Sequence, residues 1–127
     1  MCIRDSSYPT LTRGLDGVRL RTSISQSGTF FSRARLKSTR TQEPVHFVVN
    51  PKKKELIAVD IKDRWREKLQ FEDGIHVVFP ERQTRFILYP EQPPPEFRLK
   101  LQNRLGTQAG LKINVLTGVP ERWHDDE

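Results

Sequence analysis

The sequence predicts a mostly β protein: a small antiparallel barrel or sandwich of six to seven strands, preceded by a disordered basic arm. From Pro44 onward, apolar residues alternate with polar ones over short runs. Turn-forming residues separate these runs at spacings of about ten residues. Residues 1–42 lack this alternation. Strands that follow one another with only turns between them favour an antiparallel architecture over an α/β fold, and they leave barrel and sandwich open.

The basic arm, residues 1–42, carries the whole net charge of +6. It holds eight Lys or Arg and two Asp, whereas residues 43–127 hold fourteen of each sign. The arm is rich in Ser, Thr and Arg, which is the composition of an organelle transit peptide. Residues 30–35, FFSRAR, resemble a matrix-protease cleavage region. We therefore expect mitochondrial import, into or facing the matrix, with the plastid as the alternative. A disordered basic tail that stays attached and touches RNA is the other interpretation.

The first six residues, MCIRDS, look like translated adaptor sequence, so no chemistry is assigned to Cys2. A single cysteine cannot form an internal disulfide, which favours a reducing compartment. The longest apolar runs fall short of 18 residues, so we expect no transmembrane segment.

The segment Ile75–Tyr89 holds two apolar runs around a charged turn, and it predicts a central hairpin with Phe79, Phe86 and Leu88 in the core. A second hairpin is predicted around residues 50–54, NPKKK. The next run, residues 63–70, fits either a strand or a helix, because its apolar residues are also four apart.

After the central hairpin, the proline-rich residues 90–95 are expected to form an extended linker. Residues 97–101 and 111–115 alternate as strands, with Gly106 and Gly110 bracketing a loop between them. The folded domain is expected to cover residues 43–120, and residues 121–127 to form a charged tail.

Residues suited to catalysis or to metal or cofactor binding do not gather in any recognisable motif. His46, His76 and His124 lie too far apart for a metal-ligand spacing. Pairs of acids at predicted strand ends lie among lysines and arginines, where surface ion pairing accounts for them. We therefore predict no catalytic, cofactor-binding or metal residues, and an enzyme is only the third interpretation.

Basic residues of the folded part form a candidate polyanion-binding set. Its members are Lys52, Lys53, Lys54, Arg64, Arg66, Lys68, Arg98 and Lys100. Acids alternate with them and bring the domain to zero net charge, so a solvated surface is favoured over an RNA site, and no DNA binding is expected.

Apolar residues are too many for one sheet face. Val48, Val78, Ile87 and Tyr89 fall on the side opposite to that of Phe47 and its neighbours, so a second sheet or a partner must cover them. A folded part of about 85 residues also buries only about 60% of its unfolded surface. We therefore predict a non-catalytic, organelle-imported accessory or structural subunit that binds other protein subunits. The alternative is an RNA-associated protein, such as an organellar ribosome component.

Overall fold

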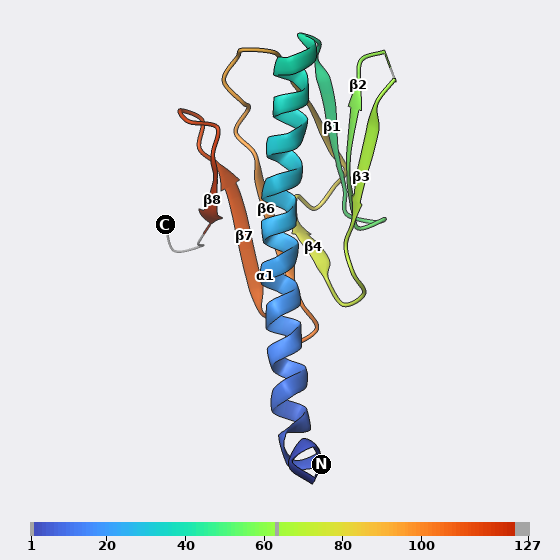
Figure 1. Ribbon diagram of the computed structural model, residues 1–127, viewed down its shortest axis with the longest axis vertical. Helices are drawn as coiled ribbons and strands as arrows, with labels where there is room; N and C mark the ends of the chain where they lie inside the picture. The colour runs from blue at the N-terminus through green and yellow to red at the C-terminus, as the bar shows by residue number, and fades with distance from the viewer. Residues whose placement is uncertain (1, 63, 124–127) are drawn as a thin grey trace.

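The computed structural model describes residues 2–62 and 64–123, with side chains for residues 15, 17–62 and 64–123 (Figure 1). It consists of the helix α1 (Cys2–Thr41) and two four-stranded sheets. Sheet A has the order β3 (Arg66–Gln70), β2 (Glu55–Asp60), β1 (Val45–Asn50) and β5 (Thr84–Leu88). Sheet B has the order β4 (His76–Phe79), β6 (Arg98–Gln102), β7 (Gln108–Ile113) and β8 (Pro120–Trp123).

The prediction of a mostly β, antiparallel protein is confirmed, because the eight strands form two sheets in which every described strand pair is antiparallel. A closed barrel is not formed within the described residues, since each sheet ends in two outer strands: β3 and β5 in sheet A, and β4 and β8 in sheet B. The hairpin around residues 50–54 joins β1 to β2 as predicted. Residues 66–70, left open between strand and helix, form β3 and pair with β2.

The predicted central hairpin is wrong, although both of its strands exist. β4 pairs with β6 in sheet B, whereas β5 pairs with β1 in sheet A, so the segment between them crosses from one sheet to the other. Alternation identifies a strand by its two faces but says nothing about its neighbour in the sheet. Phe79, expected in the core, is 44% exposed, while Leu88 is buried and Phe86 is half-buried against the core.

The C-terminal part also differs from the prediction. β7 begins at Gln108, so Gly110 lies inside a strand and does not border a loop. β8 is an eighth strand where a charged tail was expected to begin, because residues 120–123 pair with β7. The remainder of that predicted tail, residues 124–127, lies outside the described residues.

The predicted disordered arm is helical. Buried residues recur along it at intervals of three and four, at Leu20, Ile24, Ser27, Phe31, Ala34 and Ser38, with Ser23 and Phe30 buried beside them. This spacing places them on one face of a helix. The buried serines are accommodated because the Ser27 hydroxyl donates to the Ser23 carbonyl at 2.8 Å and the Ser38 hydroxyl donates to the Leu88 carbonyl at 3.1 Å.

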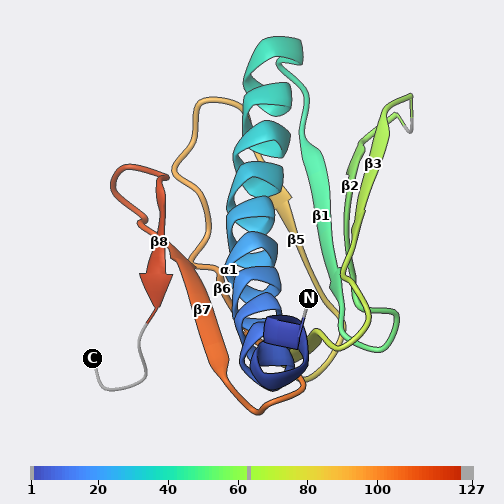
Figure 2. The same ribbon diagram turned by 60° about the horizontal axis from the view of Figure 1, so that its bottom comes forward.

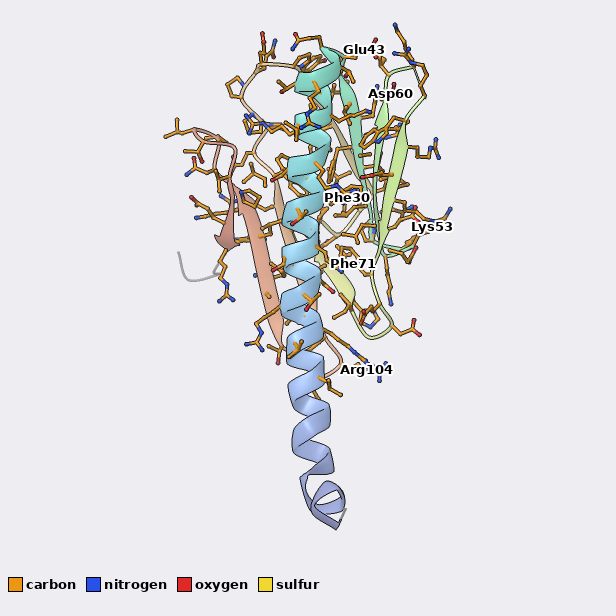
Figure 3. All side chains as sticks on the ribbon, in the orientation of Figure 1. Phe30, Glu43, Lys53, Asp60, Phe71 and Arg104 are labelled. Carbon is orange, nitrogen blue, oxygen red and sulfur yellow. The ribbon has the colours of Figure 1, made fainter. Side chains whose placement is uncertain are left out.

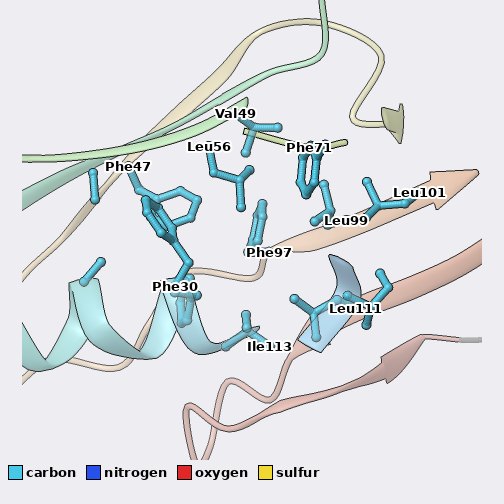
Figure 4. Close-up of a cluster of buried hydrophobic side chains, with 14 of the residues drawn as sticks. Phe30, Phe47, Val49, Leu56, Phe71, Phe97, Leu99, Leu101, Leu111 and Ile113 are labelled. Atoms are coloured by element: carbon cyan, nitrogen blue, oxygen red, sulfur yellow. The ribbon is translucent and has the colours of Figure 1, made fainter. Parts of the chain in front are cut away.

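The core lies between α1 and the inner faces of both sheets. α1 contacts β1, β2, β3 and β5 of sheet A and β6 and β7 of sheet B, and Figure 2 shows it lying between the two sheets. Phe31 is fully buried, and its ring centre lies 5.6 Å from that of Phe47 and 5.8 Å from that of Phe97. Side chains from α1, sheet A and sheet B thus converge in one cluster (Figure 4).

Candidate interaction surfaces

Sheet A turns one face to α1 and the other away from it. On the inner face, Phe47 lies opposite Ala58 and Phe86, and Phe47 and Ala58 are fully buried. The residues next to them in each strand must point to the other side, because side chains alternate across a strand. This outer face of sheet A comprises His46, Val48, Asn50, Glu55, Ile57, Val59, Arg66, Lys68, Gln70, Arg85 and Ile87.

The centre of this outer face is apolar and its two sides are basic. Val48 lies opposite Ile57, and Ile57 lies opposite Lys68 on β3. On the other side, Val48 lies opposite Arg85 on β5. The row formed by Lys68, Ile57, Val48 and Arg85 therefore has two aliphatic side chains between two cations. The next row, formed by Arg66, Val59, His46 and Ile87, has a cation at the β3 side alone.

Two large apolar residues extend this face at one end. Ile61 lies two residues beyond Val59, just past the end of β2, and Tyr89 lies two residues beyond Ile87, just past the end of β5. Ile61 is 54% exposed and Tyr89 is 48% exposed. Together with the aliphatic centre, they form the apolar surface that α1 does not cover.

Three of the four predicted partner-facing residues, Val48, Ile87 and Tyr89, therefore come together on this face. Val78 does not join them, because it belongs to β4 in sheet B and lies at a register shift between Val77 and Phe79. Sequence reasoning missed Ile57 and Val59 as members of the face. Their neighbours in β1 could be assigned only once the pairing of β1 and β2 was known.

The eight predicted polyanion-binding residues do not form one patch. Lys52, Lys53 and Lys54 lie at the β1–β2 turn, and Arg64 lies in the β2–β3 connection at the other end of β2. Figure 3 shows this separation, with Lys53 far from the end of the sheet that carries Glu43 and Asp60.

The other four are divided between the two sheets. Arg66 and Lys68 lie on the outer face of sheet A, whereas Arg98 and Lys100 belong to β6 in sheet B. The cations are therefore spread over separate parts of the molecule, and several of them have acidic partners.

A network of charges fixes the β2–β3 connection to the end of α1. The Glu43 carboxylate lies 3.0 Å from the Lys62 Nζ and 3.0 Å from the Arg64 guanidinium. The hydrogen bond from Lys62, followed by that from Arg64, lowers the pKa of Glu43. Arg64 therefore has a structural role, because its ion pair with Glu43 helps to hold the β2–β3 connection at the end of α1.

Asp60 is the buried member of the network, at 6% exposure. Its Oδ1 accepts hydrogen bonds from the backbone N–H groups of Trp65, at 3.0 Å, and Arg64, at 2.6 Å. These bonds, the Trp65 one first, lower the pKa of Asp60. A carboxylate held in this way organises a turn, and its lowered pKa is unsuited to general acid chemistry at neutral pH.

Sheet B carries an aromatic and basic cluster on its outer face. Trp123 of β8 lies opposite Gly110 of β7, which in turn lies opposite Lys100 of β6. Because Gly110 has no side chain, the Trp123 ring reaches Lys100, whose Nζ lies 4.5 Å from the ring centre. The Arg98 guanidinium carbon lies 5.4 Å from the same ring centre, and the Phe79 ring meets it edge-on at 5.4 Å.

Trp123 and Phe79 were not predicted as site residues. Phe79 was assigned to the core because its strand is apolar, and Trp123 was assigned to the tail because its neighbours are charged. Residues 120–123, PERW, do not alternate between apolar and polar side chains, so the sequence carried no strand signal for β8.

Several cations of α1 contact acidic or aromatic side chains of the segments packed against the helix. Arg33 forms an ion pair with Glu67 of β3 at 2.9 Å, and Arg19 lies 3.6 Å from Glu72. The Lys37 Nζ lies 5.3 Å from the centre of the Trp65 ring. Part of the positive charge of the arm is therefore paired within the molecule.

Groups of three or more His, Cys, Asp or Glu arranged to hold a metal ion are absent from the described residues. The described part of the chain also contains no helix long and apolar enough to cross a membrane. No protein family, curated protein or solved structure was found to match this chain.

Proposed function

We propose that this protein is a non-catalytic accessory subunit that binds another protein through the outer face of sheet A. The observation that carries the proposal is the apolar centre of that face, extended by Ile61 and Tyr89, which are 54% and 48% exposed. Contiguous exposed apolar surface with a polar border is typical of protein interfaces, whereas single exposed apolar residues are ordinary. In this proposal the two sheets, with α1 between them, act as a sandwich-like scaffold for the interface.

Charge indicates what the partner surface contains. The cations on the outer face of sheet A are Arg66, Lys68 and Arg85, and the acid there, Glu55, is buried and lies 3.8 Å from Lys68. A partner with an apolar centre and carboxylates at its border complements this face, because opposite charges at the border of an interface favour correct encounter.

We propose a mitochondrial location, with the plastid as the alternative, on the composition of residues 1–42. A cut at residues 30–35 would separate Phe30 and Phe31 from the core that they share with Phe47. Any processing compatible with this fold therefore lies ahead of Leu20, the first buried residue of α1 among the described side chains.

RNA binding is the second candidate function, and the cluster of Phe79, Trp123, Arg98 and Lys100 favours it. Aromatic rings beside cations on a sheet are the elements with which proteins stack and neutralise single-stranded nucleic acid. The cluster is small, and Arg98 forms an ion pair with Glu96 at 2.9 Å. Protein binding therefore remains the first proposal.

Affinity purification of tagged full-length protein from its native cells, with and without nuclease, tests the proposal. The test variant carries Ile61→Asp and Tyr89→Asp, which place charge on the apolar face. The matched control carries Val115→Asp and Val119→Asp, two residues that are 44% and 54% exposed outside that face. Circular dichroism melting verifies that both variants are folded.

We expect protein partners that persist after nuclease treatment, remain with the control variant and are lost with the test variant. Partners that persist equally with both variants would contradict the assignment of this face. Partners lost only on nuclease treatment would replace the first proposal with RNA binding, and a Trp123→Ala variant should then lose them.

A further inference from the structure

A groove runs between α1 and the β7–β8 side of sheet B, away from the outer face of sheet A. Its volume is about 970 Å³. Leu20 and Ile24 of α1 line one wall, Leu111 lies on the β7 side, and Pro120 and Arg122 come from β8. The groove is thus apolar at its base and bordered by a strand.

The strand that borders the groove is the outer strand of its sheet. β8 pairs with β7, and no other described strand pairs with it. Arg122 lies opposite Leu111, so its side chain is on the inner face of the sheet, toward α1. Backbone groups on the second side of such a strand can pair with an added chain.

Charge on the groove is positive. Arg21 and Arg122 are exposed lining residues, and neither has an ion pair or hydrogen bond with another side chain among those the structure describes. A third lining cation, Arg33, is paired with Glu67 at 2.9 Å. The one lining acid, Glu121, accepts a hydrogen bond from the Asn114 Nδ2 at 3.0 Å. Two arginines at the groove are therefore available to a ligand.

We infer that this groove binds an extended acidic segment of a partner protein, which adds a strand beside β8. The backbone of β8 supplies the hydrogen bonds, and side chains of the segment alternate between the groove and solvent. A carboxylate opposite Arg122 lies on the inner face, on the side of Arg21. An apolar side chain two residues away lies opposite Pro120, against the base of the groove.

The shape of the groove beside Pro120 limits which segments can bind in it. A side-chain atom placed on Gly28 of α1 would lie 3.2 Å from the Pro120 Cβ, so helix and strand approach closely at that point. The groove is therefore narrow beside Pro120 and is bordered by Arg122 and Trp123 further along β8. An extended backbone suits this strand-bordered space better than a helix of about 10 Å diameter.

Fluorescence anisotropy with labelled peptides of about six residues, the usual strand length, tests the inference on the full-length protein. One peptide, the Val/Glu peptide, has Val and Glu two residues apart with Thr between them, so that both side chains face the groove. The second, the Val/Lys peptide, has Lys in place of Glu. A third has the Val/Glu sequence with alternate backbone nitrogens methylated, which removes the donors needed for strand pairing. The protein variant carries Arg21→Glu and Arg122→Glu, and the matched control carries Arg82→Glu and Arg104→Glu, two exposed arginines that do not line the groove.

We expect the wild-type protein to bind the Val/Glu peptide and to bind the Val/Lys and methylated peptides weakly or not at all. The groove variant should lose about tenfold in affinity for the Val/Glu peptide, because two favourable pairs become repulsive. It should also prefer the Val/Lys peptide, whereas the control variant behaves as wild type. Failure of the wild type to bind the Val/Glu peptide, or equal binding of the Val/Glu and Val/Lys peptides, would overturn the inference. Equal binding of the methylated peptide would overturn the added strand.

Discussion

Gly110 lies in the middle of β7 with Trp123 of β8 directly opposite. A Cβ at this position would lie 2.8 Å from the Trp123 carbonyl oxygen and 3.0 Å from its Cβ. Glycine normally weakens a strand, and here it makes room for the Trp123 side chain to cross β7 and reach Lys100. The same residue therefore permits both the close packing of β8 and the aromatic cluster.

We predict that Gly110→Ala destabilises the protein by about 1–3 kcal/mol, the usual cost of overpacking. Denaturant unfolding measures the change. Gly17→Ala is the control, because a Cβ on Gly17 of α1 meets nothing within 4 Å. Relief of the glycine penalty in a helix should make that control more stable by up to about 1 kcal/mol. A neutral Gly110→Ala variant would show that β8 does not pack on β7 as described.

Asp60 contributes to stability through its charge, because its hydrogen bonds from Trp65 and Arg64 lower its pKa below the unfolded value of about 3.9. A lowered folded-state pKa gives stability that is present above the unfolded pKa and is lost as pH falls through the folded one. Asn at this position keeps an oxygen acceptor and removes the charge.

The Asp60→Asn variant should therefore be less stable than wild type at neutral pH, and the difference should disappear as the pH falls below about 3.9. Urea unfolding at a series of pH values measures it. Asp73→Asn, at an exposed turn, is the control and should show little difference over the same range. A stability difference that persists at low pH would mean that Asn at position 60 destabilises the protein for a reason other than the loss of charge.

At the scale of the elements, α1 shows why composition misled the sequence analysis. Ser, Thr and Arg dominate it, and only five of its buried positions are apolar: Leu20, Ile24, Phe30, Phe31 and Ala34. The three-and-four spacing was present in the sequence. It was obscured because Ser23, Ser27 and Ser38 are also buried, and a serine carries no signal of burial before its hydrogen-bond partner is known.

We predict that Phe31→Ala costs about 3–5 kcal/mol of unfolding free energy, because it leaves a cavity among Phe47, Phe86 and Phe97. Leu36→Ala on the same helix should cost less than about 1 kcal/mol, since Leu36 is 48% exposed. Thermal or denaturant unfolding of both variants measures the contrast. If both variants lose less than about 1 kcal/mol of unfolding free energy, Phe31 does not pack in the core, and the prediction of a disordered arm would stand again.

At the scale of the whole molecule, alternation in the sequence predicted most strands but could not predict which sheet each belongs to. β4 and β5 are adjacent in the chain and lie in different sheets, because the chain crosses between the sheets three times: before β4, before β5 and before β6. The outer face of sheet A was therefore predicted only in part. Val48 and Ile87 share it because β1 lies beside β5, a neighbourhood that no local pattern encodes. The groove escaped prediction entirely, since α1 and β8 come from the two ends of the chain.

Because α1 packs in the same core as the two sheets, the fold limits how far the chain can be shortened from its N-terminal side. A protein that begins at Gly17 keeps all the described buried residues of α1, whereas one that begins at Glu43 loses Leu20, Phe30 and Phe31 and exposes their partners on both sheets. We predict that the first truncation retains a cooperative unfolding transition and that the second does not. Circular dichroism melting and one-dimensional NMR of the two proteins measure the difference. If import trims the chain in the cell, intact-mass measurement of the native protein should place its new first residue ahead of Leu20. A folded, stable protein that begins at Glu43 would instead show that α1 is dispensable to the two sheets, and the transit-peptide cut at residues 30–35 would again be possible.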